Sequence, residues 1–182
     1  MIVEQTLHVK PSNNNARNLT FGALAASLLL MAVYMAVPLY KGIVGMFTLA
    51  AIVTVVFIYS RYVGSYYFYD IGFDGSGVPV FVVRTVTGRR QSTLARISLA
   101  DIVSLVREDA EARKNHKTAN GVRKYFYSPT LCPKITYRMT VSSRYENAEL
   151  IIEGSEEYAE MLRRYAILAR ENYPNDSVWD EE

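Results

Sequence analysis

The sequence predicts an α+β protein: a transmembrane helical hairpin leads into an antiparallel β domain, which one amphipathic helix caps at its C-terminal end. Three observations support this class. Between Leu19 and Val63 only Lys41 and Arg61 are charged, residues 65–153 contain several short runs typical of strands, and residues 156–172 carry one apolar stripe at helical spacing. The predicted units are a polar leader (1–18), the hairpin (19–63), the β domain with its helix (64–173) and an acidic tail (174–182).

The overall composition excludes two classes of protein. A net charge of +2 over 182 residues is too small to indicate a nucleic-acid partner. The single cysteine, Cys132, excludes an intrachain disulfide framework.

Two uncharged runs, Leu19–Leu39 with 21 residues and Ile43–Ser60 with 18, predict two membrane-spanning helices. A helix rises about 1.5 Å per residue and the hydrocarbon core is about 30 Å thick, so roughly 20 residues cross it. One continuous helix would be about twice too long and would leave Lys41 near its middle, so we expect a turn at 41–42. The residues expected to anchor the hairpin at the membrane interfaces are Tyr40, Lys41, Arg61 and Tyr62.

A hairpin buried in a soluble protein, or a cleaved signal peptide, would also contain apolar helices. Core helices seldom contain uncharged runs of this length, and the leader contains Glu4 and several Asn residues rather than a basic cluster. Two spans place both chain ends on one side of the membrane. Because Lys10, Arg17 and Arg61 flank the spans on that side and only Lys41 lies on the other, we expect both termini in the cytoplasm and the helices in the inner (plasma) membrane.

The middle of each span contains no ionisable residue, which favours an anchor over a channel or transporter. Small residues recur at helical spacing and would allow close helix contact, either between the two spans or between copies of the chain. These pairs are Gly22 with Ala26, Ala23 with Ser27, and Ala50 with Thr54.

The β domain is expected to begin with strands at 65–73, 78–86 and 91–99, separated by turns at 74–77 and 87–88. Residues 98–108 fit a strand entered through a bulge better than a helix capped by Ser98. A polar loop over 109–121 precedes strands at 122–127, 135–141 and 149–153. Ser155 is expected to cap the final helix, whose stripe comprises Tyr158, Met161, Leu162, Tyr165 and Leu168.

About six or seven antiparallel strands followed by one amphipathic helix form a recognisable arrangement. The segments GRRQSTLARISLADIVSLVRE (88–108) and AELIIEGSEEYAEMLRRY (148–165), behind a two-span hairpin, resemble bacterial membrane-anchored pleckstrin-homology-like (PH-like) domain proteins. The resemblance covers roughly residues 65–170. It implies a split β-barrel closed at one end by the helix, with a binding or scaffolding role and no catalytic activity. We also expect no cofactor.

Few residues could perform catalysis. His8 lies in the leader and His116 in the polar loop, and Cys132 has no neighbour in the sequence that would activate it. A thiol enzyme would need Cys132 and His116 to pair, whereas a packing thiol and a solvated imidazole are the favoured interpretation. The spacing of Cys, His and acidic residues indicates neither zinc nor calcium, so we expect no metal site and no enzyme.

Charge is distributed unevenly along the β domain. Residues 84–144 contain 13 Lys or Arg and 4 Asp or Glu, a net of +9, whereas residues 145–182 contain 3 and 11, a net of −8. The basic part could face anionic lipid headgroups, an attraction of about 1 kcal/mol per basic residue near the surface. A simpler explanation, which we favour, is that the two parts complement each other or that the charges are solvated. The candidate anion-binding residues are Arg84, Arg89, Arg90, Arg113, Lys114, Lys117, Arg123 and Lys124.

The resemblance adds one expectation, because the first hairpin of PH domains carries phosphate-binding residues and Arg84, Arg89 and Arg90 occupy a similar hairpin. Together these observations predict a non-enzymatic membrane protein whose cytoplasmic β domain binds lipid headgroups, a protein partner or a second copy of itself. The alternative is a small oligomeric transport or immunity-type membrane factor, with the β domain as its regulator.

Overall fold

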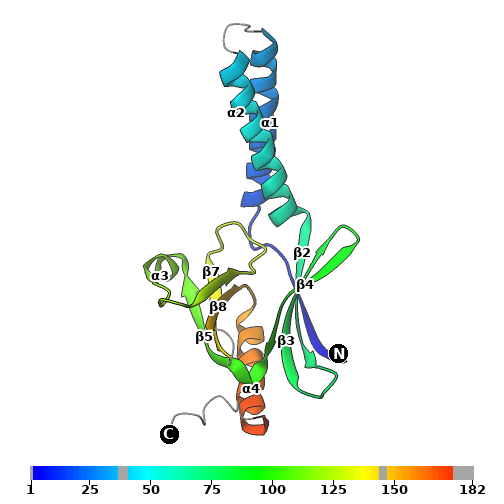
Figure 1. Cartoon of the computed structure of the whole chain (residues 1–182), viewed down its shortest axis with the longest axis vertical. Coiled ribbons are helices and arrows are strands. Elements are labelled where there is room, and N and C mark those ends of the chain that lie inside the picture. The colour runs from blue at the N-terminus through cyan, green and yellow to red at the C-terminus, as the bar shows by residue number, and fades with distance from the viewer. Residues whose placement is uncertain (1, 37–40, 144–146, 174–182) are drawn as a thin grey trace.

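The computed structural model describes residues 2–36, 41–143 and 147–173, and it shows two long helices rising from one end of a β-rich domain (Figure 1). The chain begins with β1 (Ile2–Val9), α1 (Asn15–Ala36) and α2 (Lys41–Ile58), which continues as a π-helical segment (Tyr59–Val63). The remaining elements are β2 (Ser65–Phe73), β3 (Pro79–Thr87), β4 (Arg90–Ser98), a 3-10 turn (Leu99–Asp101), β5 (Ile102–Asp109), α3 (Ala110–Asn115), β6 (Arg123–Phe126), β7 (Ile135–Ser142), β8 (Asn147–Ile152) and α4 (Glu156–Asn172).

β1 is a strand inside the segment that was expected to be a polar leader. It pairs antiparallel with β2, so that Val9 lies opposite Tyr67 and Ile2 lies opposite Phe73. The two helices are therefore inserted between neighbouring strands of one sheet. The leader belongs to the β domain, and its pairing with β2 could not be read from residues 1–18 alone.

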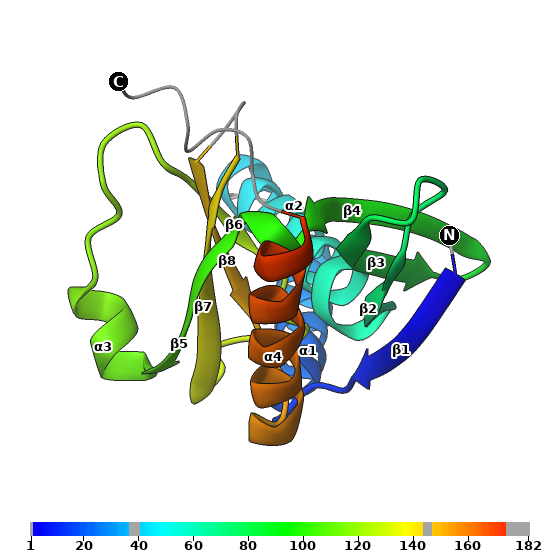
Figure 2. The ribbon, with the colours of Figure 1, turned by 90° about the horizontal axis from the view of Figure 1, so that it is seen from below.

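The strands form two four-stranded sheets, ordered β1-β2-β3-β4 and β5-β7-β8-β6. Figure 2 shows α4 lying between them. The expected split barrel is thus corrected to two open sheets, with eight strands among the described residues and with β6 parallel to β8. The reason is that α4 fills the space between the sheets, while the 3-10 turn carries the chain from β4 to β5. The Ser98 side chain caps this turn by accepting a hydrogen bond from the Ala100 N–H.

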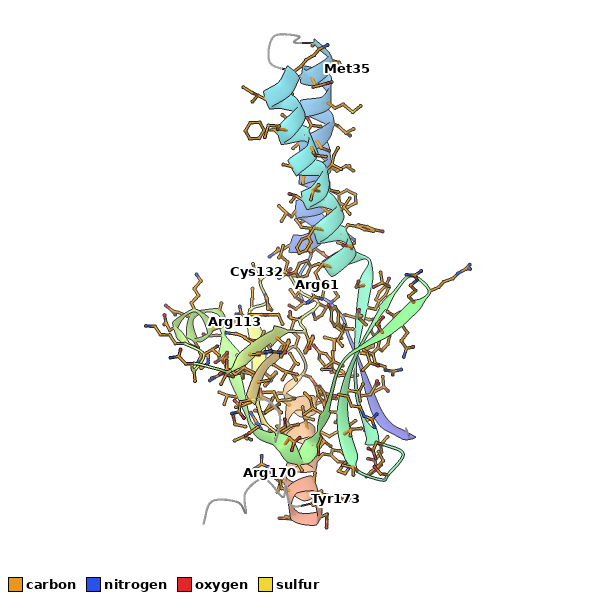
Figure 3. The ribbon with its side chains drawn as sticks, viewed as in Figure 1. Met35, Arg61, Arg113, Cys132, Arg170 and Tyr173 are labelled. Carbon is orange, nitrogen blue, oxygen red and sulfur yellow. The ribbon has the colours of Figure 1, made fainter. Side chains whose placement is uncertain are left out.

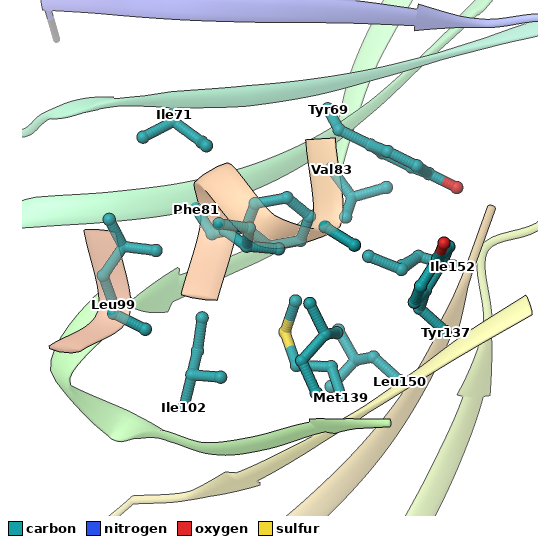
Figure 4. Close-up of a cluster of buried hydrophobic side chains, with 14 of the residues drawn as sticks. Tyr69, Ile71, Phe81, Val83, Leu99, Ile102, Tyr137, Met139, Leu150 and Ile152 are labelled. Carbon is teal, nitrogen blue, oxygen red and sulfur yellow. The ribbon is translucent and has the colours of Figure 1, made fainter. Parts of the chain in front are cut away.

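The hydrophobic core lies between the sheets and includes side chains from both sheets and from α4 (Figure 4). Tyr69 and Phe81 of the first sheet, Met139 of the second and Leu162 of α4 have no exposed surface. Burying a side chain of this size contributes about 1.5–3 kcal/mol. The three layers therefore share one core and fold as a unit.

The expected bounds of α4 are confirmed, and Ser155 caps the helix by accepting a hydrogen bond from the Tyr158 N–H at 3.2 Å. The expected stripe is wrong at its C-terminal end. Ala166 and Ala169 are buried there, whereas Leu168 is 52 % exposed. Small side chains at these two positions allow α4 to approach the 3-10 turn closely.

α4 also covers the outer edge of β5, the terminal strand of the second sheet. The guanidinium of Arg163 donates to the Leu105 carbonyl at 2.9 Å, and that of Arg170 donates to the Val103 carbonyl at 3.0 Å. Edge carbonyls that are already bonded are less available for pairing with another strand.

Two further expectations concern the segment between the sheets. The strand expected over 98–108 is confirmed from Ile102 onward, because the residues before it form the 3-10 turn. The polar loop expected over 109–121 contains the short helix α3. Asp109 caps α3 by accepting hydrogen bonds from the N–H groups of Glu111 and Ala112, at 3.0 and 2.7 Å.

α1, with 22 residues, and α2 with its π-helical segment, with 23 residues, are long and apolar enough to cross a membrane. Their surface is almost entirely exposed, as Leu29 at 70 % and Met46 at 75 % illustrate. α2 begins at Lys41, which is exposed, so the turn expected at 41–42 is wrong and Gly42 is helical. Residues 37–40, including Tyr40, lie outside the described residues.

Candidate functional site at the base of the helices

Two short connections join the helices to the β domain, and polar contacts hold both. We use the word junction for residues 10–14, 59–64 and 126–134 together with Glu153. The Ser12 N–H donates to the Thr130 hydroxyl oxygen at 2.8 Å, and the side-chain amide of Asn13 donates to the Leu131 carbonyl at 3.3 Å. These bonds fix the residues that precede α1 against the loop that precedes β7.

Glu153 lies at the floor of the junction and is 5 % exposed. Its carboxylate accepts hydrogen bonds from the Ser12 hydroxyl at 3.3 Å and from the Thr130 N–H at 3.2 Å. Burial raises the pKa of Glu153, and the hydrogen bonds from Thr130, Ser128 and Ser12 oppose this rise without cancelling it. Glu153 therefore takes up a proton more readily than an exposed glutamate does.

Tyr69 connects the hydrophobic core to the junction. Its hydroxyl donates to the Tyr127 carbonyl at 2.6 Å and accepts a hydrogen bond from the Glu153 N–H at 3.2 Å. Burial raises the pKa of the Tyr69 hydroxyl, so this group keeps its proton and remains a donor. One side chain of the first sheet thereby bonds to two segments of the second half of the domain.

Arg61 holds the end of α2 to the domain (Figure 3). Its guanidinium donates to the Phe126 carbonyl at 2.7 Å and lies 5.1 Å from the centroid of the Tyr67 ring. Tyr62, also expected at the membrane interface, lies beside the same guanidinium at 5.5 Å. Arg61 is at the base of the helices, as the sequence suggested, but it bonds inward to the domain.

A cleft of about 430 Å³ opens beside the junction, between the end of β1 and the start of β7. Lys10 lines it from the β1 side and Lys134 from the β7 side, and both side chains are exposed. Glu153 and Ser155 line it where β8 leads into α4. Neither lysine was among the expected site residues, because the two stand far apart in the sequence and only the pairing of β1 brings them to one cleft.

Arg84, expected to bind anions, is an internal ion-pair partner. It pairs with Asp70 of β2, whose side chain is fully buried, and the Thr6 hydroxyl of β1 donates to the same carboxylate at 2.7 Å. This charge is neutralised within the first sheet, although the Arg84 side chain is still 27 % exposed. The expectation that Arg84 faces lipid stays a prediction.

Arg89 and Arg90 lie at the β3–β4 turn, where they are exposed. Gly88 in this turn has a φ of 59°, a left-handed conformation that glycine adopts without strain. Figure 1 places this turn and α3 on opposite sides of the point where the helices leave the domain. The candidate basic residues are thus not gathered into one site.

The basic residues near α3 differ in their surroundings. Arg113 donates to the Thr136 hydroxyl oxygen at 3.0 Å and to the Pro133 carbonyl at 2.8 Å, so it fastens α3 to the second sheet. The Lys124 ammonium lies 5.5 Å from the centroid of the Phe126 ring. The exposed residues of this group are Lys114, Lys117 and Arg123.

A buried polar cluster on the second sheet was not anticipated from the sequence. His116 Nε2 lies 2.9 Å from Glu149 Oε1, the Thr118 hydroxyl donates to Glu149 at 3.0 Å, and Arg138 Nε lies 2.8 Å from Glu108 Oε1. Burial acts to raise the pKa of Glu149, but hydrogen bonds from His116 and Thr118 and the charges of His116 and Arg138 outweigh it, so the pKa is lowered. His116, expected to be solvated, instead clamps the segment after α3 to β8.

These clusters are arranged for holding the fold together. In the part of the chain that the structure describes, no group of three or more His, Cys, Asp and Glu side chains is placed to hold a metal ion. Cys132 is exposed in the loop before β7, while the contacts of His116 are with Glu149 and Arg138. The expected absence of a cysteine–histidine nucleophile stays a prediction.

No family model, no curated protein and no solved structure matches this chain, so the PH-like resemblance stays a prediction.

Proposed function

We propose that this chain is an integral membrane protein in which α1 and α2 form a two-span anchor and the β domain is a non-enzymatic binding or scaffolding module. The domain would lie against the cytoplasmic face of a bacterial inner membrane, as the resemblance to PH-like proteins implies. Its partners would be membrane lipids and a protein, or a second copy of the chain.

One observation supports the anchor above all others, namely the exposure of the helices. Seventeen large apolar side chains of α1 and α2 are exposed, whereas the β domain already has a complete core of its own. Leaving so many apolar groups in water would forgo on the order of 20 kcal/mol, which exceeds the whole stability of a typical domain. A lipid environment removes that cost. A hairpin buried in a soluble protein would instead need other protein segments to cover these apolar side chains.

The strand pairing supports the proposed topology independently of the charges near the spans. β1 precedes α1 and β2 follows α2, yet the two strands pair along their length. A hairpin that crosses the bilayer twice is the arrangement that lets both strands meet on one side. The basic residues Lys10, Arg17 and Arg61 then favour the cytoplasm for that side.

The junction supports a scaffolding role, because it attaches the domain to both helices. Ser12 and Asn13 bond the entry to α1, and Arg61 bonds the exit from α2. Two attachments fix the orientation of a domain more firmly than one flexible linker. Arg89 and Arg90 of the β3–β4 turn are among the expected basic residues that are exposed and available to headgroups.

The native cysteine provides the test of this proposal. Cys132 is the single cysteine, is exposed and lies at the base of the helices (Figure 3). In inverted inner-membrane vesicles an impermeant maleimide should modify Cys132, and in intact spheroplasts it should not. The protein should also stay in the membrane pellet after alkaline carbonate extraction.

The matched control moves the reporter to the other end of the helices. In a Cys132→Ser background, Gly42→Cys should show the opposite pattern of labelling, and a Cβ at Gly42 meets nothing within 4 Å among the described residues. Labelling of both positions from the same side, or release of the protein by carbonate, would contradict the proposed anchor.

A further inference from the structure

We propose that the cleft between β1 and β7 binds the phosphate of an anionic lipid headgroup, with Lys10 and Lys134 as its cationic walls. This inference rests on the proposed function, because the ligand comes from the bilayer in which α1 and α2 sit. It names a site distinct from the arginines of the β3–β4 turn.

The depth of the cleft matches the headgroup layer. Ser12 and Asn13 line the cleft and lie just before Asn15, where α1 begins. The uncharged run of α1 starts at Leu19, and four residues of helix rise about 6 Å. The polar headgroup layer is roughly 5–7 Å thick on each side of the hydrocarbon core. The mouth of the cleft is thus at the level where lipid phosphates lie.

The charges of the cleft suit a phosphate group. Lys10 directly follows β1 of the first sheet and Lys134 directly precedes β7 of the second, so the packing of the two sheets places two cations along one cleft. Glu153 also lines the cleft, but it accepts hydrogen bonds from Ser12 and Thr130.

The size and walls of the cleft fit more than an isolated phosphate ion. Its volume of about 430 Å³ lies within the usual range for small-ligand sites, roughly 300–1,000 Å³. Leu7, Val9 and Ile135 contribute to its lining, and Ile135 is 43 % exposed. These apolar side chains would contact the glycerol backbone and the first acyl carbons of the lipid. Arg89 and Arg90 of the β3–β4 turn do not line this cleft.

The test measures lipid binding by the full chain in a mild non-ionic detergent. Native mass spectrometry would follow the titration of phosphatidylglycerol, and of phosphatidylcholine with the same acyl chains, onto wild-type protein. The variant Lys10→Gln/Lys134→Gln removes both cations, and Lys114→Gln/Lys117→Gln removes two exposed lysines away from the cleft. We expect the cleft variant alone to lose about thirtyfold in affinity for phosphatidylglycerol, from about 1 kcal/mol per lysine.

Three results would overturn the site. Equal losses in the two variants would show diffuse surface attraction. Equal binding of the two lipids by wild-type protein would show that no headgroup charge is recognised. Full displacement of phosphatidylglycerol by equimolar glycerol 3-phosphate would assign the cleft to a soluble phosphate ester. If the anchor itself is wrong, carbonate extraction will release the protein from the membrane, whatever the lipid titration shows. The proposed anchor and the proposed lipid site can therefore fail independently.

Discussion

Replacing Arg84 with glutamine tests the inference that its ion pair with Asp70 stabilises the fold. The substitution leaves the Asp70 carboxylate, which has no exposed surface, with the Thr6 hydroxyl as its remaining contact on β1. Two opposite charges about 4 Å apart attract by roughly 4 kcal/mol at an effective dielectric constant of about 20. Because the Arg84 side chain is 27 % exposed, water replaces part of this attraction. We therefore expect a loss of about 3 kcal/mol in the free energy of unfolding.

Thermal unfolding of the full chain in detergent micelles, followed by circular dichroism in the β-sheet region, would measure this loss. A destabilisation of about 3 kcal/mol corresponds to a fall of about 10 °C in the melting temperature for a domain of this size. Arg89→Gln is the matched control, since Arg89 is exposed and its replacement should change stability by less than about 0.5 kcal/mol. Adding Asp70→Asn to Arg84→Gln should recover part of the loss, because the buried charge is then gone. If Arg84→Gln melts together with Arg89→Gln, the ion pair is dispensable and Arg84 returns as a candidate lipid ligand.

Three further predictions address the other clusters. Because the pKa of Glu149 is lowered, its contribution to the free energy of unfolding is fully present above the unfolded pKa, near 4.5. This contribution is lost as the pH falls through the folded pKa. His116→Leu removes a hydrogen bond that lowers this pKa, so the midpoint of acid unfolding should move to higher pH; an unchanged midpoint would show that the clamp is not formed. Gly45→Leu should destabilise the helical pair by about 1–3 kcal/mol, because a Cβ at Gly45 already meets the Tyr34 ring at 3.4 Å. Gly42→Leu is the control, because a Cβ at Gly42 meets nothing within 4 Å among the described residues. Steric trapping of the two helices would compare the variants, and equal effects would refute the packing. Arg61→Gln should speed amide hydrogen exchange in residues 59–67, since α2 loses its bond to the Phe126 carbonyl, and protection equal to wild type would contradict this role.

The elements that depend on local signals could be predicted from the sequence. α4 has its cap, its acidic first turn and its apolar stripe within one segment, and β2 and β3 are joined by a short polar turn. The register of this hairpin would also have allowed the ion-pair partner of Arg84 to be predicted. In its register Arg84 lies opposite Phe68, which places Asp70 on the same face and diagonally across from it.

The junction could not be predicted, because its residues come from distant parts of the chain. Leu7 and Val9 alternate with polar neighbours in the leader, a period-two signal for β1, but the run is short and its partner lies beyond both helices. Ser12, Thr130 and Glu153 follow no periodicity at all. Their contacts exist only once β1 has paired and the two sheets have packed on α4.

Because the helices lie between β1 and β2 in the chain, β1 is synthesised well before the strand with which it pairs. At 5–20 residues per second, the 55 residues between Val9 and Ser65 take about 3–11 s to emerge after β1 has left the ribosome. During that time β1 lacks its partner β2, and in the proposed two-span topology it can pair only after both helices have entered the bilayer and the chain has returned. A chain whose second helix fails to insert would leave β2 on the wrong side, with its edge bare and prone to aggregation. In the proposed topology, completion of the first sheet therefore requires correct insertion of both helices, so the pairing of β1 with β2 depends on the topology of the anchor.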